Sequence, residues 1–101
     1  MPAQHTLNLK HLPETRSRDK LFVRFDLERS EARTLEANRE ISVYEVKNET
    51  KGTSYECELF IDAVGRKVGR CTCLARIICK HLLRSIGLHV ARKRALARAA
   101  Q

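Results

Sequence analysis

The chain has 101 residues, a mass of 11.6 kDa and a net charge of +8, which describes one small basic domain and excludes two independent cores. With no Trp and only five aromatic residues, the core must be built from Leu, Ile, Val and Ala, and a metal or covalent cross-link would support it. No apolar run approaches the ~20 residues of a membrane span, and residues 1–10 lack the order of a secretion signal. We therefore expect an intracellular protein that does not enter a membrane.

The N-terminal third predicts an extension, a strand and a helix. Residues 1–20 are polar and mixed in charge, which favours a loosely docked extension. In residues 21–27, apolar side chains alternate with Arg24 and Asp26, the period-2 pattern of a half-buried strand. A short helix should follow, with Ser30 as its N-cap and Asn38 at its end.

The central part predicts an antiparallel β-hairpin. Residues 41–47 are rich in β-forming side chains, and the Asn, Gly and Thr of residues 48–54 favour a turn. Residues 55–62 alternate again and place Cys57 on the apolar side of the second strand, so we expect Cys57 to be a packed thiol. The segment 65–69, GRKVG, should turn or break the chain again just before Cys71.

The C-terminal part predicts two helices. Ile78, Leu82 and Ile86 recur every four residues, and Gly87 stands where a helix commonly ends. A second, Ala/Arg-rich helix should span residues 90–100, and His89 at the boundary has no chemistry assigned to it.

Four potential metal ligands lie within eleven residues: Cys71, Cys73, Cys79 and His81. Two pairs, C-x-C and C-x-H, can converge on one ion from a tight turn and form a closed tetrahedral Cys₃His set, which is typical of structural zinc. Residues two apart on a helix point to nearly opposite sides, so Cys79 should lie just before a helix that begins near Lys80 and has His81 in its first turn. The spacing predicts one structural zinc ion per chain.

Three other roles for the cysteines explain the spacing less well. Buried free thiols would explain one or two positions but not two matched pairs. A Cys71–Cys73 disulfide would close a strained, very small ring and leave Cys79 unexplained. An iron–sulfur cluster with three Cys and one His stays open, although CDGSH-type proteins place the His four residues after the last Cys and His81 follows Cys79 by two.

These ligands and their surroundings resemble the SWIM zinc finger, whose pattern is C-x-C, a spacer, then C-x-H. The resemblance covers residues 28–87: a short helix, a strand around Val43, a strand beginning at Tyr55, the CTC turn, and CKHLL entering a helix. It implies a zinc-binding module that binds DNA or proteins.

The predicted fold class is therefore α+β, in the style of a ββα zinc finger. It comprises a short helix, an antiparallel hairpin or small meander, a zinc-stapled turn and C-terminal helices. Three regions follow: a polar extension (1–20), a SWIM-like domain (21–87) and a basic C-terminal helix or tail (88–101).

Charge is distributed unevenly along the chain. Residues 1–62 hold 10 basic and 12 acidic side chains, whereas residues 63–101 hold 10 basic and no acidic ones. The ten basic residues are Arg66, Lys67, Arg70, Arg76, Lys80, Arg84, Arg92, Lys93, Arg94 and Arg98. Three of them, four apart in sequence, should form a cationic ridge opposite the apolar face of one helix: Arg76, Lys80 and Arg84.

This basic segment predicts a nucleic-acid-binding protein that contacts the phosphate backbone, with DNA favoured over RNA. Too few base-reading or stacking side chains are present to predict sequence-specific recognition. The alternative is an adaptor that docks on a larger protein partner. Cys79 and His81 could be read as a nucleophile and its base, but they belong to the metal set and no oxyanion-binding group accompanies them, so we expect no enzymatic activity.

Overall fold

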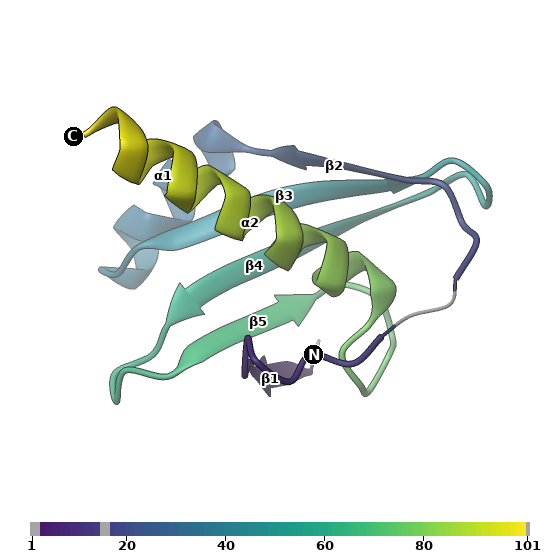
Figure 1. The fold of residues 1–101 in the computed structure, drawn as a ribbon, viewed down its shortest axis with the longest axis horizontal. Coiled ribbons are helices and arrows are strands. Elements are labelled where there is room, and N and C mark those ends of the chain that lie inside the picture. Colours follow the sequence, from purple (N-terminus) through teal and green to yellow (C-terminus); the bar gives the residue numbers. More distant parts are fainter. Residues whose placement is uncertain (1–2, 15–16, 101) are drawn as a thin grey trace.

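A computed structural model of the chain describes residues 3–14 and 17–100. Within those ranges the chain forms five strands and two helices around one sheet (Figure 1). In chain order these are β1 (Gln4–Thr6), β2 (Leu21–Phe25), α1 (Leu27–Ala37), β3 (Ile41–Asn48), β4 (Thr53–Ile61), β5 (Lys67–Cys71) and α2 (Lys80–Ala99). The architecture confirms the predicted α+β class. The sheet has five strands and is therefore larger than the predicted hairpin or small meander.

The sheet is antiparallel throughout and has the order β1-β5-β4-β3-β2. Its centre is a meander of β3, β4 and β5, which the sequence predicts in part. The edges are β2, which pairs with β3, and β1, which pairs with β5 through the registers Gln4↔Arg70 and Thr6↔Val68. Residues 4–6 therefore belong to the sheet, and the prediction of a loosely docked extension over residues 1–20 is wrong for this strand. Residues 1, 2, 15 and 16 of that predicted extension lie outside the described part of the chain.

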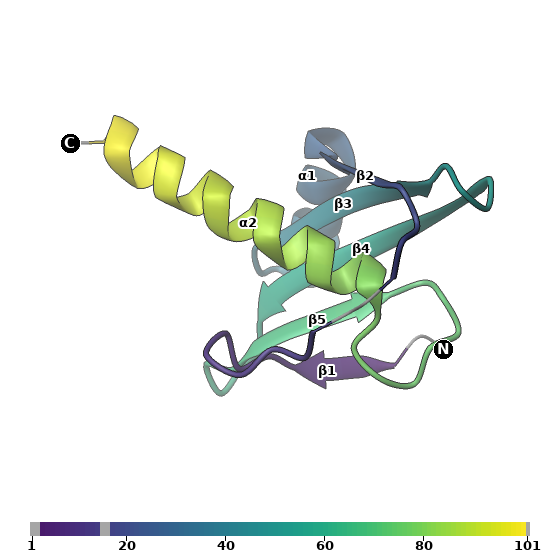
Figure 2. The same cartoon turned by 45° about the vertical axis from the view of Figure 1, so that its right-hand side comes forward.

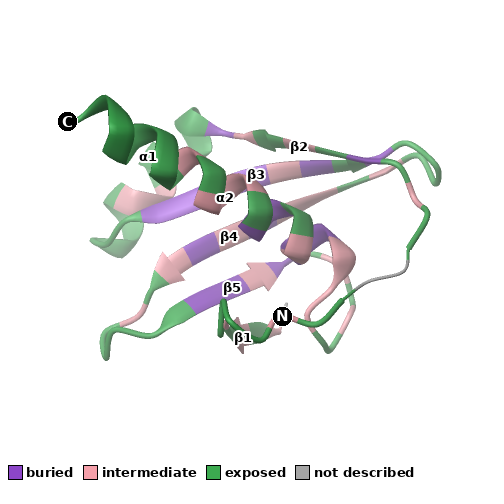
Figure 3. Ribbon diagram, in the orientation of Figure 1, coloured by how far each residue is buried: buried purple, intermediate pink, exposed green. Residues whose placement is uncertain are grey.

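The two helices lie on opposite faces of the sheet, α2 in front of it and α1 behind it in Figure 1. On the α2 face, alternate residues of the strands form the core together with Leu82 and Ile86 of the helix. Figure 3 shows the buried residues along the strands. The core consists of Leu21, Tyr44, Val46, Cys57, Leu59, Cys71, Leu82 and Ile86. Cys57 is fully buried among them, in agreement with its predicted packing.

Helix α1 begins four residues earlier than predicted. Its N-cap is Asp26, whose carboxylate accepts the backbone N–H of Arg29 at 3.0 Å. Ser30 lies inside the helix, where its hydroxyl bonds the carbonyl of Asp26 at 2.6 Å and accepts the N–H of Val43 at 2.8 Å. The end at Asn38 is as predicted, since this residue adopts the left-handed conformation with φ 52°.

Gly69 determines how closely α2 approaches the sheet. A methyl group on Gly69 would lie 3.0 Å from Leu59 Cδ2 and 3.0 Å from Leu82 Cδ1, tighter than most carbon–carbon contacts, so these two side chains would have to shift. The missing side chain therefore lets the first turns of α2 lie directly on β5 and β4. Because this contact sits at the start of the helix, it also positions the residues that precede it.

The two predicted C-terminal helices are one helix of 20 residues, α2. Gly87 lies inside it rather than ending it, so the predicted boundary at residue 87 is wrong. A glycine in a helix costs about 1 kcal/mol relative to alanine. The burial of Leu82 and Ile86 on one side of Gly87, and the packing of Val90 against the core on the other, outweigh that cost.

Replacing Gly87 by Ala should raise the free energy of unfolding by about 0.5–1 kcal/mol, because Gly87 is exposed and a Cβ there meets no atom within 4 Å. Urea denaturation followed by circular dichroism measures the change. Gly52→Ala is the matched control and should destabilise, since Gly52 has φ +68°. A destabilised Gly87→Ala protein would instead indicate that the helix ends at residue 87.

Candidate metal centre

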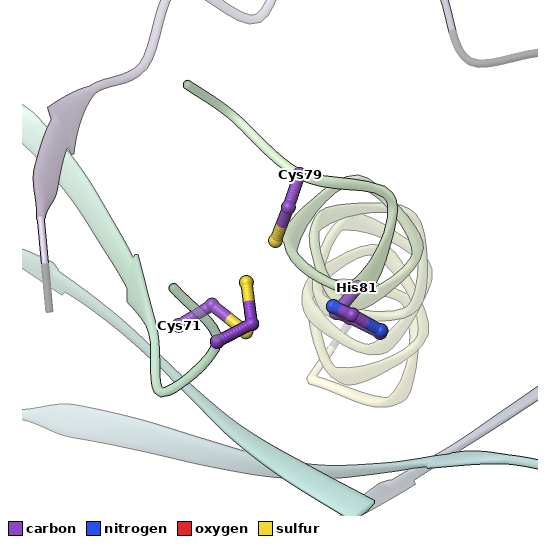
Figure 4. Close-up of side chains that lie close together, drawn as sticks. Cys71, Cys79 and His81 are labelled. Atoms are coloured by element: carbon purple, nitrogen blue, oxygen red, sulfur yellow. The ribbon is translucent and has the colours of Figure 1, made fainter. Parts of the chain in front are cut away.

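The four predicted ligands converge where β5 ends and α2 begins. Cys71 is the last residue of β5, Cys73 lies in the following loop, Cys79 is the N-cap of α2, and His81 is in its first turn. Their ligand atoms all lie within 4.8 Å of one another. Figure 4 shows the side chains of Cys71, Cys79 and His81 arranged around a common space. The predicted placement of Cys79 before the helix and His81 within it is confirmed.

These separations suit a single ion. A tetrahedral site with metal–sulfur bonds of about 2.3 Å places its sulfur atoms roughly 3.8 Å apart. The four atoms are therefore close enough to reach one ion with small side-chain adjustments, and all come from one short segment that the sheet and α2 hold at both ends. These residues could bind a metal ion.

The buried ring nitrogens of His81 lack hydrogen-bond partners, and a metal ion could bind one of them. The side chain is buried, yet neither Nδ1 nor Nε2 has a hydrogen-bond partner. Its ring packs against Tyr55, with ring centroids 4.3 Å apart. Burial lowers the pKa of His81, and the charge of Lys80 lowers it further, so the imidazole is neutral at neutral pH. A neutral, buried imidazole with a free nitrogen is the form that coordinates a metal.

The thiols are protonated in the absence of a cation. The hydrogen bond with the Cys57 thiol and burial raise the pKa of Cys71, and burial raises the pKa of Cys73. The hydrogen bond with Cys71, and then burial, raise the pKa of Cys79. A bound cation reverses this balance, because it stabilises the thiolate forms that coordinate it. The Cys79 sulfur also accepts the Leu82 N–H at 3.4 Å at the positive end of α2, which favours its thiolate.

Cys57 lies directly opposite Cys71 across β4 and β5 but is not among the four grouped ligands. Cys57 therefore packs beside the site and is not one of the four candidate ligands. His89 lies elsewhere, near the middle of α2, and its Nδ1 is 2.7 Å from the hydroxyl of Tyr44. The prediction that His89 has no chemical role missed this hydrogen bond, which links residues 45 positions apart.

The N-terminal segment covers part of the metal centre. Asp19 pairs with Lys80 in the first turn of α2 and accepts a hydrogen bond from Asn48 Nδ2 at 2.9 Å. His5 and Pro13 line the same hollow as Cys73, Cys79 and His81. The sequence did not predict these contacts, because no local pattern in residues 1–20 indicates which part of the chain they contact.

Half of the ten basic residues of the C-terminal segment are engaged within the protein. Arg66 pairs with Asp62, Arg70 with Glu58, Lys80 with Asp19, and Lys93 with Glu40. Arg92 donates to the Tyr44 hydroxyl at 3.1 Å and lies 3.5 Å over the ring of Phe25. The other five are exposed and form no ion pair with any described residue: Lys67, Arg76, Arg84, Arg94 and Arg98.

The structure does not bring together the three residues of the predicted cationic ridge in one helical row. Arg76 lies in the loop before α2, so it does not continue the helical row of Lys80 and Arg84. At 100° per residue, Arg84, Arg94 and Arg98 instead project within about 80° of one another on the solvent side of α2. We call these three residues the arginine face.

No family model, curated protein or solved structure matches this chain. None of the helices in residues 3–14 and 17–100 is both long and apolar enough to cross a membrane. The metal-ligand geometry and the charge distribution therefore carry the functional argument.

Replacing His81 by Ala should abolish high-affinity metal binding, because it removes one of four ligands from a closed site. A competition titration with a chromogenic chelator measures the affinity, and circular dichroism reports the accompanying loss of structure. His89→Ala and Cys57→Ala are the controls and should retain the metal, since neither residue belongs to the group. Release of the metal by His89→Ala would contradict the ligand assignment.

Proposed function

We propose that this protein is a SWIM-type zinc module that binds nucleic acid, DNA in preference to RNA, through the phosphate backbone. The observation that carries the proposal is the arginine face, Arg84, Arg94 and Arg98, which is exposed and forms no ion pair with any described residue. It lies on the helix whose first turn holds His81 of the Cys₃His group. The protein would act as an accessory or regulatory factor, without catalytic activity of its own.

Zinc is the metal that this ligand set favours. Three thiolates and one imidazole at a β-strand end and a helix start form a closed site with no open coordination position, as structural zinc requires. Zinc with three thiolates carries about −1, so the surrounding basic surface stays positive after metal binding. Four free cysteines also favour a reducing, intracellular compartment.

The SWIM resemblance supports the same assignment. Its pattern of helix, strand, strand, C-x-C turn and C-x-H helix start corresponds to α1, β3, β4, the loop after β5 and the first turn of α2. The chain departs from a minimal module in its two edge strands and its long helix. These additions enlarge the core that supports the metal site.

The arrangement of the arginine face favours binding to the phosphate backbone of a nucleic acid. Arg84 and Arg98 are 14 residues apart, about 21 Å along the helix axis, a span over which a duplex presents several phosphates. Side chains of this kind neutralise phosphates and release counterions but read no bases. Basic residues that the protein already uses internally, such as Lys80, contribute less, because each must leave a carboxylate partner.

A second candidate function, a protein adaptor, is favoured by the loop between β5 and α2. Leu74 and Ile77 in this loop are 99% and 75% exposed, although both are large and apolar. The two ligand pairs hold the loop at both ends, so these side chains form a firm apolar projection that a protein partner could cover.

Elemental analysis of the purified, folded protein should find one zinc ion per chain, because the four ligands form one closed site. The visible absorption spectrum provides the complementary measurement and should be featureless. Iron in the protein together with broad visible absorption would assign the site to an iron–sulfur cluster instead.

The double substitution Arg84→Gln with Arg98→Gln should flatten the salt dependence of duplex DNA binding. Each phosphate contact contributes about 0.9 to the slope of log affinity against log salt, so the slope should fall by roughly 1.8, with similar weakening on unrelated sequences. Fluorescence anisotropy at several salt concentrations, with duplex DNA, single strands and RNA, measures it.

The charge-matched control is Arg24→Gln with Lys47→Gln. Both residues are exposed on the sheet face opposite α2, where they pair with Glu45 at 3.1 and 3.6 Å, and Arg24 also lies 3.9 Å from Asp26. This control should leave the slope unchanged. If the arginine-face variant also keeps the original slope while its fold and zinc content are intact, the arginine face is only a solvated surface and the adaptor function is favoured.

A further inference from the structure

A second cavity lies far from the metal centre, beneath the C-terminal half of α2. Its volume is about 530 Å³, within the range of small-molecule sites. Helix α2 forms its roof, the ends of β4 and β5 form its floor, and the segment after β1 forms one wall. Figure 2 shows the last turns of α2 extending past this end of the sheet.

The cavity walls are mainly apolar. Ile86, Val90 and Ala97 line it from the helix, Leu59 and Ile61 from β4, and Leu7 and Leu9 from the segment after β1. Two of these side chains are well exposed, Ile61 by 58% and Leu9 by 40%. Exposed apolar side chains from separate elements that face one hollow favour an apolar occupant.

Positive charge surrounds these walls. Lys67, Lys93 and Arg94 line the cavity, and Glu40 is the one carboxylate among its described lining residues. Glu40 is already bound to Lys93 at 2.8 Å, whereas Lys67 and Arg94 form no ion pair with any residue that the structure describes. The lining therefore carries a net charge of +2, from three cations and one anion.

His89 adds a directed donor to the lining. The Tyr44 hydroxyl accepts a hydrogen bond from Arg92, so its own hydrogen is free to be donated to His89 Nδ1. Nδ1 is then the acceptor, and the imidazole proton resides on Nε2. A neutral His89 thus offers an Nε2–H donor to an oxygen atom in the cavity.

We infer that this cavity binds a single-chain amphiphile with an anionic head, a medium- to long-chain carboxylate. The chain would lie among the apolar walls, and the head would be bound by Lys67 and Arg94 with the His89 Nε2–H nearby. A protein helix is about 10 Å wide, whereas a cavity volume of about 530 Å³ is that of a small-molecule site. The inference does not require zinc or nucleic-acid binding, although Arg94 belongs both to the cavity lining and to the arginine face.

The test is a titration of the metal-loaded protein with octanoate, decanoate and laurate, each below its micelle concentration, by isothermal titration calorimetry. Each two-carbon extension should tighten binding roughly ten-fold or more, because each buried methylene contributes about four-fold. Dodecanol should bind more weakly than laurate, and Lys67→Gln should weaken laurate at least several-fold while leaving dodecanol unchanged. Affinity that does not depend on chain length would overturn the inference.

Matched variants locate the site. Ala97→Phe fills the cavity and should lower laurate affinity at least ten-fold, whereas Ala95→Phe places the same ring on the solvent side of α2 and should not. Arg84→Gln removes a charge outside the cavity and should also have no effect. Unfolding curves and zinc content establish that each variant is folded. Equal laurate binding by Ala97→Phe and Ala95→Phe would overturn the inference.

Two further arms separate other occupants. Sedimentation with phosphatidylglycerol vesicles should show no binding that depends on Ala97. Binding to vesicles, but not to monomeric laurate, that is lost in Ala97→Phe would assign the cavity to a membrane surface and overturn the inference. The same pattern with an acidic amphipathic peptide in place of the vesicles would assign it to a protein partner, with the same consequence.

Discussion

The packing of Leu82 onto the glycine at position 69 is the contact on which the rest of the structure depends. It lets α2 begin directly on β5, and the helix then crosses the sheet with Leu82 and Ile86 in the core. The same contact places the first turn of α2 next to the end of β5. Cys79 and His81 are thereby placed near Cys71 and Cys73, where one ion could reach all four residues.

The grouped Cys and His side chains of the candidate metal centre destabilise the fold unless a cation binds them. His81 is buried with both ring nitrogens unpaired, and the three thiols crowd together with raised pKa values. Unpaired buried polar groups of this kind destabilise a fold by roughly 1–3 kcal/mol each. A chain of 101 residues with only five aromatic residues has little surplus stability to offset that cost, so metal binding and folding should be strongly coupled.

Helix α2 presents different chemistry on its different sides and along its length. Its first two turns bury Leu82 and Ile86, while its C-terminal half roofs an apolar cavity and carries arginines on its solvent side. The basic residues therefore divide into groups with different tasks. Arg92 stabilises the fold through Tyr44 and Phe25, Lys67 belongs to the cavity, and Arg84 and Arg98 face solvent. Net charge alone does not distinguish these groups.

The sequence by itself determined the α+β class, the central strands and the four residues that could bind a metal ion, because these depend on short-range periodicity and spacing. Cys79 could be placed before the helix because two ligands two residues apart cannot share one helix face. Only the tertiary structure decided the pairing of β1 with β5, the continuity of α2 through Gly87, the Asp19–Lys80 pair and the Tyr44–His89 hydrogen bond. Each depends on partners about 45 to 65 positions away, or on burial against the sheet that outweighs a local helix-ending signal. Local sequence patterns contain no information about such distant partners, so these contacts cannot be predicted from neighbouring residues.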